Sequence, residues 1–265
     1  APQATGIVGA IDPGLPPHLN LGVTLAFMRE FAARHGFDAQ ARSFEVRELV
    51  LELTTALHLS IAEQACEDTT ADGYHAVGFA TLFVSHAHAC SFSKMLDATE
   101  AYLDLHALDK KRAFVWLDIF VIRQHLVEYE TPYIGRVELT IGHVVMVLDP
   151  WDKPVCLTRV WCLFELVHSL DPQVIFDLTV PPEERARFIG ELQRDKAGVE
   201  ELLTAFDARN AQVTVEADRD VIISMINHKF AYRDHLGIYV DGLEVFNDVT
   251  RSAIRMALAA FSWNM

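Results

Sequence analysis

Four nearly continuous apolar runs constrain the fold of this chain more than any other feature of its sequence. Their starts recur at roughly 30-residue intervals, the size of a β-α-β unit, at 76–85, 113–122, 144–149 and 174–178. Their β-branched and aromatic residues, with little polar alternation, are typical of strands buried on both faces of a parallel sheet. Because parallel strands are joined by crossovers, the pattern predicts a helix after each strand.

The segments between and after these runs have helical character. We expect helices at 91–108, 131–143, 158–171, 181–206, 218–226 and 243–261, and a fifth strand at 211–216. The helix at 181–206 has the clearest start, with prolines in its first turn and Glu183 and Glu184 near its positive end. Repeated strand–helix alternation predicts an α/β fold with a parallel sheet of about five strands flanked by helices.

The first 75 residues have a different pattern. Residues 1–20 are rich in Gly and Pro and predict a loop or arm, 21–35 predict a helix, and 44–67 predict a helical stretch broken near two threonines. We therefore predict an N-terminal arm and helical extension at 1–75, followed by an α/β domain with C-terminal helices at 76–265.

The charge of the chain excludes several partners. Its formal net charge is −15, which disfavours nucleic acid and anionic lipid surfaces, since both need a basic face. A small phosphorylated ligand stays possible, because a local site can be positive on an acidic protein.

No apolar run approaches the ~20 residues of a membrane helix. The four cysteines form no CxxC pair and no signal-peptide pattern opens the chain, so we expect a cytoplasmic protein with reduced thiols.

Polar and aromatic residues follow three of the predicted strands. Ligands of open parallel sheets bind beyond the carboxyl ends of the strands. The segments there are Ser85-His86-Ala87-His88, Asp118-Ile119-Phe120 running to Arg123-Gln124-His125, and Asp149-Pro150-Trp151-Asp152.

Glu165 stands inside the apolar helix predicted at 158–171. The i, i+3 and i+4 spacing places Trp161, Cys162, Glu165 and His168 on one side of it. A helix glutamate is most often solvated, and in that interpretation Glu165 pairs with Arg159. A carboxylate between Trp and His near strand ends is instead the setting of a perturbed pKa in a cleft.

These residues resemble a known family. "RVWCLFEL" resembles the WCxxEL signature of TIR (Toll/interleukin receptor) domains, "FATLFVSHA" their first strand, and "FVWLDIFVI" their second strand and the start of the BB loop. "PWDKPVCLTRVWCLFE" is similar to the P-W-x-x-P-x-x-L-T-R-x-W-C-L-x-E motif of a divergent TIR-like group. The resemblance covers about residues 76–230 and implies a flavodoxin-like topology. The helices expected within 20–67 resemble an extension typical of that group rather than of TIR domains at large.

What the resemblance implies is NAD⁺ chemistry, with NAD⁺ as substrate and no cofactor. Glu165 matches the glutamate that assists cleavage of the nicotinamide–ribose bond, as in an NAD⁺ glycohydrolase or ADP-ribosyl cyclase. The nicotinamide leaves from a cationic ring, so one carboxylate that stabilises an oxocarbenium-like transition state suffices. We expect substrate-binding roles for Ser85, His86, His88, Asp118, Phe120, Gln124, Trp151 and Trp161. His88 replaces a Trp of the closer group, so Trp151, Trp161 or Phe120 would supply the stacking ring.

Other readings stay open. TIR domains also serve as self-associating signalling scaffolds in immunity, and 122–133 could form such a contact. A nucleoside-processing N-glycosidase would share the sheet and use a glutamate.

A metal site is suggested by histidines 86, 88, 125, 143 and 168. The chain has twelve histidines, so such a grouping arises easily by coincidence, and we predict no metal. Cys162 beside His168 is more typical of packing than of a nucleophile.

Overall fold

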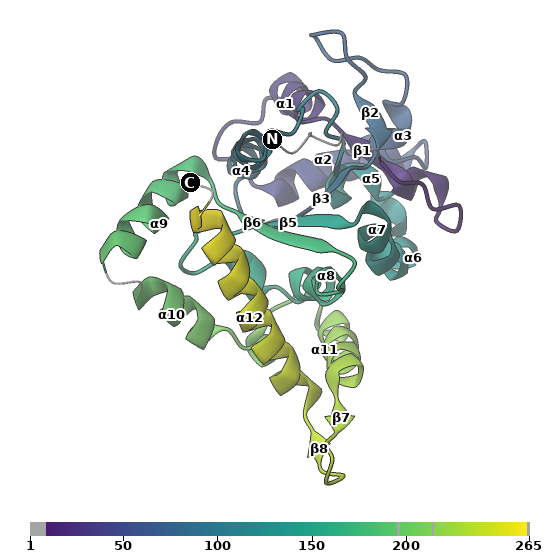
Figure 1. Ribbon diagram of the computed structural model, residues 1–265. Helices are drawn as coiled ribbons and strands as arrows, with labels where there is room; N and C mark the ends of the chain where they lie inside the picture. The colour runs from purple at the N-terminus through teal and green to yellow at the C-terminus, as the bar shows by residue number, and fades with distance from the viewer. Residues whose placement is uncertain (1–8, 195–196, 214, 264–265) are drawn as a thin grey trace.

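The computed structural model describes residues 9–194, 197–213 and 215–263. Its centre is a six-stranded sheet in the order β2-β1-β4-β3-β5-β6 (Figure 1). The strands are β1 (Leu21–Val23), β2 (Val77–Phe79), β3 (Leu82–Ser85), β4 (Val115–Trp116), β5 (His143–Val147) and β6 (Ile175–Thr179). The strands β4, β3, β5 and β6 run parallel, whereas β1 is antiparallel to both β2 and β4. The α/β class is confirmed, but the sheet is mixed rather than wholly parallel.

Helices surround the sheet. They are α1 (Leu25–Arg34), α2 (Ser43–Thr55), α3 (Ile61–Gln64), α4 (Phe92–Leu105), α5 (Asp118–Val121), α6 (Val127–Glu130), α7 (Ile134–Ile141), α8 (Val160–Ser169), α9 (Pro182–Arg194), α10 (Ala197–Ala205), α11 (Glu216–Phe230) and α12 (Gly242–Trp263). Short 3-10 turns lie at Pro17–Asn20, Gln124–Leu126, Thr131–Tyr133, Val155–Thr158 and Ala208–Asn210. The break predicted within 44–67 is present, because α2 ends at Thr55, whereas 181–206 forms two helices rather than one.

The sheet is buried on both faces. Along β5, Val145 and Val147 belong to one core cluster and Met146 to a second. The first cluster holds residues of α1, α2 and α4, and the second holds residues of α8, α11 and α12. Figure 1 shows α4 and α12 on opposite sides of β6, and both helices pack against that strand. Burial on both faces explains why the strands read as continuous apolar runs.

Residues 21–23 form a strand where the sequence predicted the start of a helix. The helix α1 begins at Leu25, and the Thr24 side chain caps it by accepting a hydrogen bond from the Phe27 N–H at 3.3 Å. A Cβ at Gly22 would lie 2.8 Å from the backbone carbonyl of Phe114. The absence of a side chain there lets β1 approach its neighbour closely.

Two of the predicted strands differ from the apolar runs that indicated them, and a third is absent from the described residues. The run 76–85 forms two strands, β2 and β3, and the run 113–122 contributes only two residues to β4 before the chain turns into α5. The fifth strand predicted at 211–216 is wrong for the described residues of that segment, which make one isolated bridge, from Gln212 to Arg159.

The two parts predicted by the sequence share one sheet and one core cluster. Strand β1 lies between β2 and β4, and Met28, Phe31 and Val46 pack in the same cluster as β3 and β4. Within the described residues, no helix is both long enough and apolar enough to span a lipid bilayer.

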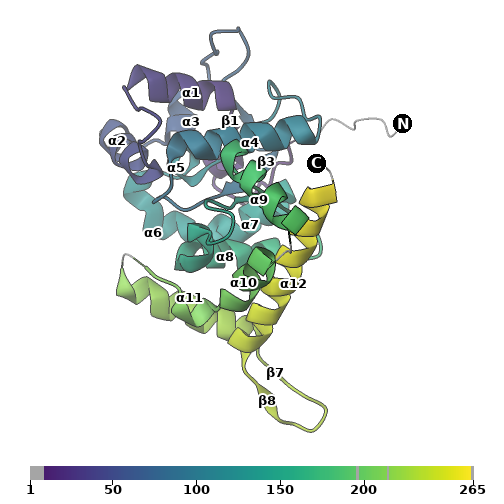
Figure 2. The same ribbon diagram turned by 90° about the vertical axis from the view of Figure 1, so that its left-hand side faces the viewer.

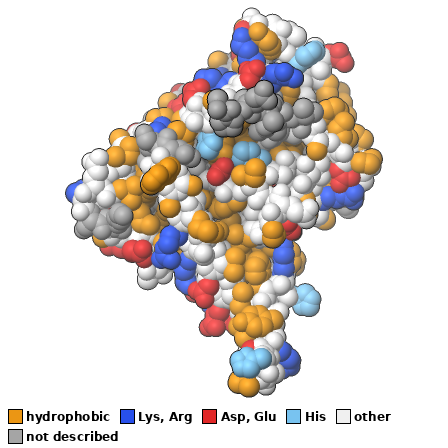
Figure 3. All heavy atoms as spheres, viewed as in Figure 1, with side chains coloured by type: hydrophobic (Ala, Val, Ile, Leu, Met, Phe, Trp, Pro, Cys, Tyr) orange, Lys and Arg blue, Asp and Glu red, His pale blue; other side chains and the backbone are white. Residues whose placement is uncertain are grey.

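A two-stranded hairpin projects from the body of the molecule in both ribbon views (Figures 1 and 2). It consists of β7 (Tyr232–Arg233) and β8 (Tyr239–Val240), which pair antiparallel between α11 and α12. Tyr232, Leu236, Ile238 and Tyr239 are exposed on it. Figure 3 shows apolar side chains, in orange, along this projecting end.

Candidate functional site

Ser85 and Glu165 meet at the carboxyl end of β3. Ser85 is the last residue of the strand and is buried, and its hydroxyl donates a hydrogen bond of 2.5 Å to Oε2 of Glu165 on α8. The thiol of Cys162, one turn earlier on α8, donates to the backbone carbonyl of His86 at 3.4 Å. These two contacts fix α8 against the strand end, so Glu165 faces the edge of the sheet where ligands of such folds bind.

The carboxyl of Glu165 has a strongly perturbed pKa. Burial raises the pKa to about 8, the negative charge of Asp118 adds to this, and the Ser85 hydrogen bond opposes it. The free protein therefore holds this carboxyl mostly protonated at neutral pH. A perturbed carboxyl at a strand end is a property of functional sites.

Asp118 and His88 form a second pair beside it. Nε2 of His88 lies 2.8 Å from Oδ2 of Asp118, and both side chains are half-buried. Burial alone would raise the pKa of Asp118, but the charge and the hydrogen bond of His88 outweigh it and hold the pKa below its usual range. Asp118 is therefore an anion at neutral pH.

His86 lies next to this pair in the interior. Its side chain is only 6% exposed, and its ring centre lies 5.2 Å from that of His88. Burial lowers the pKa of His86 to about 3, with a further contribution from His88, so its imidazole is neutral. Its buried Nε2 has no hydrogen-bond partner in the part of the chain that the structure describes.

Helix α2 positions both segments of this site. The N–H of Phe44 donates to the backbone carbonyl of His88 at 3.0 Å, which holds the loop after β3. Nε of Arg47 donates to Oε1 of Gln124 at 2.8 Å, and Nε2 of Gln124 donates to the carbonyl of Asp118 at 2.7 Å. The predicted extension thus contributes directly to the arrangement of the site.

Phe120 and Gln124, both predicted to bind substrate, use their side chains inside the protein. Phe120 is fully buried and packs edge-on against Phe31, with ring centres 5.1 Å apart. It has no exposed ring face for stacking on a ligand, because α5 turns it into the core. Gln124 is also buried, and its amide is used in holding the backbone at Asp118, Ile119 and Ile122.

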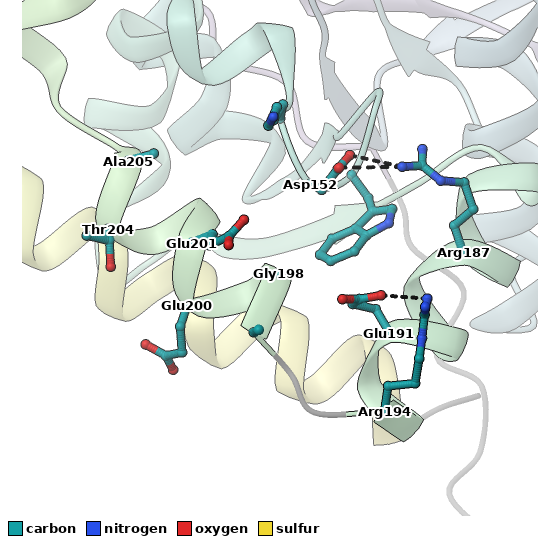
Figure 4. Close-up of a pocket in the computed structure, with 12 residues that line it drawn as sticks. Asp152, Arg187, Glu191, Arg194, Gly198, Glu200, Glu201, Thr204 and Ala205 are labelled. Carbon is teal, nitrogen blue, oxygen red and sulfur yellow. Dashed lines mark hydrogen bonds and ion pairs between the residues drawn. The ribbon is translucent and has the colours of Figure 1, made fainter.

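The predicted tryptophans lie apart from each other. Trp161 is 37% exposed on α8, beside Phe164 at 5.8 Å between ring centres. Trp151 is buried against Phe188 and lines a different pocket, of about 820 Å³, between α9 and α10. Figure 4 shows the ion pairs Asp152–Arg187 and Glu191–Arg194 in this pocket. Its lining does not include Ser85, Asp118 or Glu165.

Glu138 is a buried carboxyl that the sequence reading missed. It lies on α7, fully buried, and Oε2 is 2.9 Å from the Ser169 hydroxyl, which is 3.0 Å from the backbone carbonyl of Glu165. Burial raises the pKa of Glu138 well above its usual value, and the charge of Glu165 adds to this. Its position inside an amphipathic helix gave no sequence signal beyond one acidic residue among apolar ones.

The thiol of Cys162 is not arranged as a nucleophile. Burial raises its pKa well above the usual value, and the thiol donates to a backbone carbonyl. The ring of His168 makes its hydrogen bond, through Nδ1, with the Phe164 carbonyl at 2.9 Å. A buried thiol with a raised pKa is inert.

The assembled site therefore contains one perturbed glutamic acid, one serine hydroxyl, two histidines and one aspartate at a strand edge. Such a set can bind sugar hydroxyls, stabilise a developing cation or exchange a proton. Comparisons of the chain with protein-family models, with curated proteins and with solved structures returned no match.

Proposed function

We propose that this chain is a TIR-like enzyme that cleaves the nicotinamide–ribose bond of NAD⁺ with Glu165. The observation that carries the proposal is the contact between Ser85 and Glu165 at the carboxyl end of β3. It places the glutamate of the WCxxEL-like segment beside the Ser-His segment that follows the strand. These are the two segments that the sequence resemblance relates to one active site.

The order of the parallel strands supports the same reading. The four parallel strands lie across the sheet in the order β4-β3-β5-β6. Numbered by their order in the chain, they read 2-1-3-4. This is the strand order of flavodoxin-like folds, whose ligands bind where the order reverses, between the first and third strands. Here that position lies between β3 and β5, and we propose the flavodoxin-like, TIR-like topology on this ground.

The chemistry requires Glu165 as a carboxylate. Its pKa of about 8 in the free protein falls when the cationic nicotinamide ring binds beside it, since an opposite charge favours the ionised form. The carboxylate then stabilises the oxocarbenium-like ribose as neutral nicotinamide leaves, so no general acid is needed. Water as acceptor gives ADP-ribose, and a hydroxyl or ring nitrogen of the substrate gives a cyclic product.

The other polar groups suit binding of the rest of the nucleotide. In this proposal Ser85 orients the Glu165 carboxylate, and Asp118 with His88 contacts ribose hydroxyls or phosphate. Trp161 is the one predicted ring with a large exposed area, so it is the proposed stacking partner of a base.

A self-associating scaffold is the second candidate. The exposed apolar side chains of the β7–β8 hairpin favour it, because clustered exposed apolar residues mark contact surfaces. Catalysis and self-association are compatible, but only catalysis needs Glu165.

Nicotinamide release tests the proposal. Purified protein at high concentration is incubated with NAD⁺, and nicotinamide is followed by chromatography for wild type, Glu165→Gln and the control Glu52→Gln, which alters an exposed glutamate of α2. We expect release by wild type and control, and at least a ~100-fold loss in Glu165→Gln. Equal release by all three variants contradicts the role of Glu165. No nicotinamide release from a wild type that self-associates favours the scaffold. The same proteins are also incubated with nucleosides, and release of a base from nucleosides but not from NAD⁺ favours an N-glycosidase.

A further inference from the structure

We propose that His86, His88 and Asp118 bind one divalent transition-metal ion of the Zn²⁺ class. The histidines of the sequence alone led us to predict no metal, and Asp118 was not among the candidate ligands. The proposal does not depend on NAD⁺ cleavage. It rests on the way the fold brings the loop after β3 against the first residue of α5.

The geometry of the three side chains carries the proposal. One potential ligand atom from each of His86, His88 and Asp118 lies within 4.8 Å of the others. A tetrahedral zinc ion with nitrogen and oxygen ligands at 2.0–2.2 Å separates its ligand atoms by roughly 3.4 Å. Nε2 of His88 and Oδ2 of Asp118 now lie 2.8 Å apart, so an ion would bind where these two half-buried side chains separate slightly.

The buried nitrogen of His86 is the independent observation. Its side chain is 6% exposed, and Nε2 has no hydrogen-bond partner among the described residues. Nearly all buried polar atoms are paired, and each exception calls for an explanation, such as an ion. A leucine would occupy a similar volume without an unpaired nitrogen. A metal ion beside His86 and His88 would give such a nitrogen a partner.

The surrounding contacts fix both ligand-bearing segments. The carbonyls of His86 and His88 accept from the Cys162 thiol and the Phe44 N–H, and the carbonyl of Asp118 accepts from Gln124. Outer contacts that orient metal ligands strengthen binding. The positions of the three residues are therefore held by the backbone on either side of the site.

The ligand set selects the type of ion. Imidazole suits Zn²⁺, Cu²⁺, Fe²⁺ and Ni²⁺, whereas Mg²⁺ and Ca²⁺ take oxygen ligands. Three protein ligands are the number found at zinc sites that keep a further position open for water or a small molecule. The net charge of −15 adds a general attraction for cations.

Cobalt binding tests the site with a readout separate from enzyme activity. The full chain is treated with a chelator and titrated with Co²⁺, whose visible absorption reports its coordination, and Zn²⁺ is then added as a competitor. We expect one equivalent of Co²⁺ with tetrahedral or five-coordinate absorption, displaced by one equivalent of Zn²⁺. His88→Gln and Asp118→Asn should each weaken Co²⁺ binding at least ~100-fold. Loss of a residue that only orients a metal ligand typically weakens metal binding less than this.

The control is His235→Gln, which alters an exposed histidine of the β7–β8 hairpin and should bind as wild type does. Because His88 and Asp118 are half-buried, both variants should fold, and circular dichroism verifies this. As a second measurement, Zn²⁺ should raise the thermal midpoint of wild type but not of His88→Gln. Absence of one-equivalent binding, or binding unchanged in both site variants, overturns the proposal. Neither outcome alters the nicotinamide test of Glu165.

Discussion

Arg47 and Gln124 join the N-terminal part of the chain to the loop that follows Asp118. Nε of Arg47 on α2 donates to Oε1 of Gln124 at 2.8 Å, and the amide nitrogen of Gln124 lies within 3.3 Å of three backbone carbonyls at the end of α5. One buried side chain thus adds a hydrogen-bond donor for backbone carbonyls of this four-residue helix and its C-cap, although the Asp118 carbonyl also accepts the Ile122 N–H at 3.0 Å.

Replacement of Gln124 should therefore destabilise the fold. Gln124→Leu leaves buried carbonyls and the Arg47 guanidinium without this partner, and we expect a loss of about 2 kcal/mol in the free energy of unfolding. Urea denaturation measures it, with Gln64→Leu on the exposed side of α3 as the matched control. If Gln124→Leu lowers the free energy of unfolding no more than the control does, water molecules replace the Gln124 amide as donors to these carbonyls.

The raised pKa of Glu165 predicts a pH dependence of stability. The folded carboxyl titrates near pH 8 and the ordinary value is 4.5, so between these pH values the folded state holds a proton that the unfolded state has lost. Stability should therefore fall as the pH rises through this window, by about 3 kcal/mol between pH 6 and pH 9. Glu165→Gln cannot titrate and should lack this component. The free energy of unfolding is measured in urea as a function of pH for both proteins. Parallel curves for wild type and Glu165→Gln would refute the raised pKa of Glu165.

Phe120 and Trp161 should respond differently to removal of their rings. Phe120→Ala empties a fully buried core position and should cost about 3–5 kcal/mol of stability. Trp161→Ala alters a ring that is 37% exposed and should cost under about 1 kcal/mol. If Trp161 stacks on the nucleotide, its removal should raise KM for NAD⁺ roughly tenfold, for a stacking contact of ~1 kcal/mol or more. A KM equal to that of wild type excludes the stacking role.

A fragment of residues 76–265 should not fold by itself. Removal of the preceding residues deletes β1 from between β2 and β4 and removes Met28, Phe31, Val46 and Val50 from the core cluster. We expect no cooperative thermal transition by circular dichroism, in contrast to the full chain. A sharp transition in the fragment would establish an autonomous domain with the boundary that the sequence predicted.

The apolar runs predicted the α/β class, but not where each strand ends. At 113–122 a ten-residue run contains the two-residue strand β4 and then the buried helix α5, and periodicity cannot distinguish buried strands from buried helices over such short lengths. Strand β1 has three residues, too few to show any period. The antiparallel part of the sheet therefore had no signal in the sequence.

The candidate site was predictable in part. Ser85, His86, His88, Asp118 and Glu165 follow or face strand ends, so topology alone brings them close. The direction of a side chain within a turn is not given by topology, which is why Phe120 and Trp151 point into other parts of the structure. Glu138 reaches Glu165 through Ser169 on a neighbouring helix, a relation set only by helix packing.

The insertion of β1 into the sheet also bears on how the chain is made. Val23 pairs with Val77 and with Val115, and a ribosome delivers these residues in that order. Strand β1 therefore leaves the ribosome before its partners do, and the edge that faces β4 stays unpaired until the chain beyond Val115 has emerged. Pairings between distant residues slow folding, because long loops must close first. This architecture thus leaves one edge of β1 unpaired until the chain beyond Val115 has been synthesised, and exposes an early strand to chaperones and neighbouring chains during that interval.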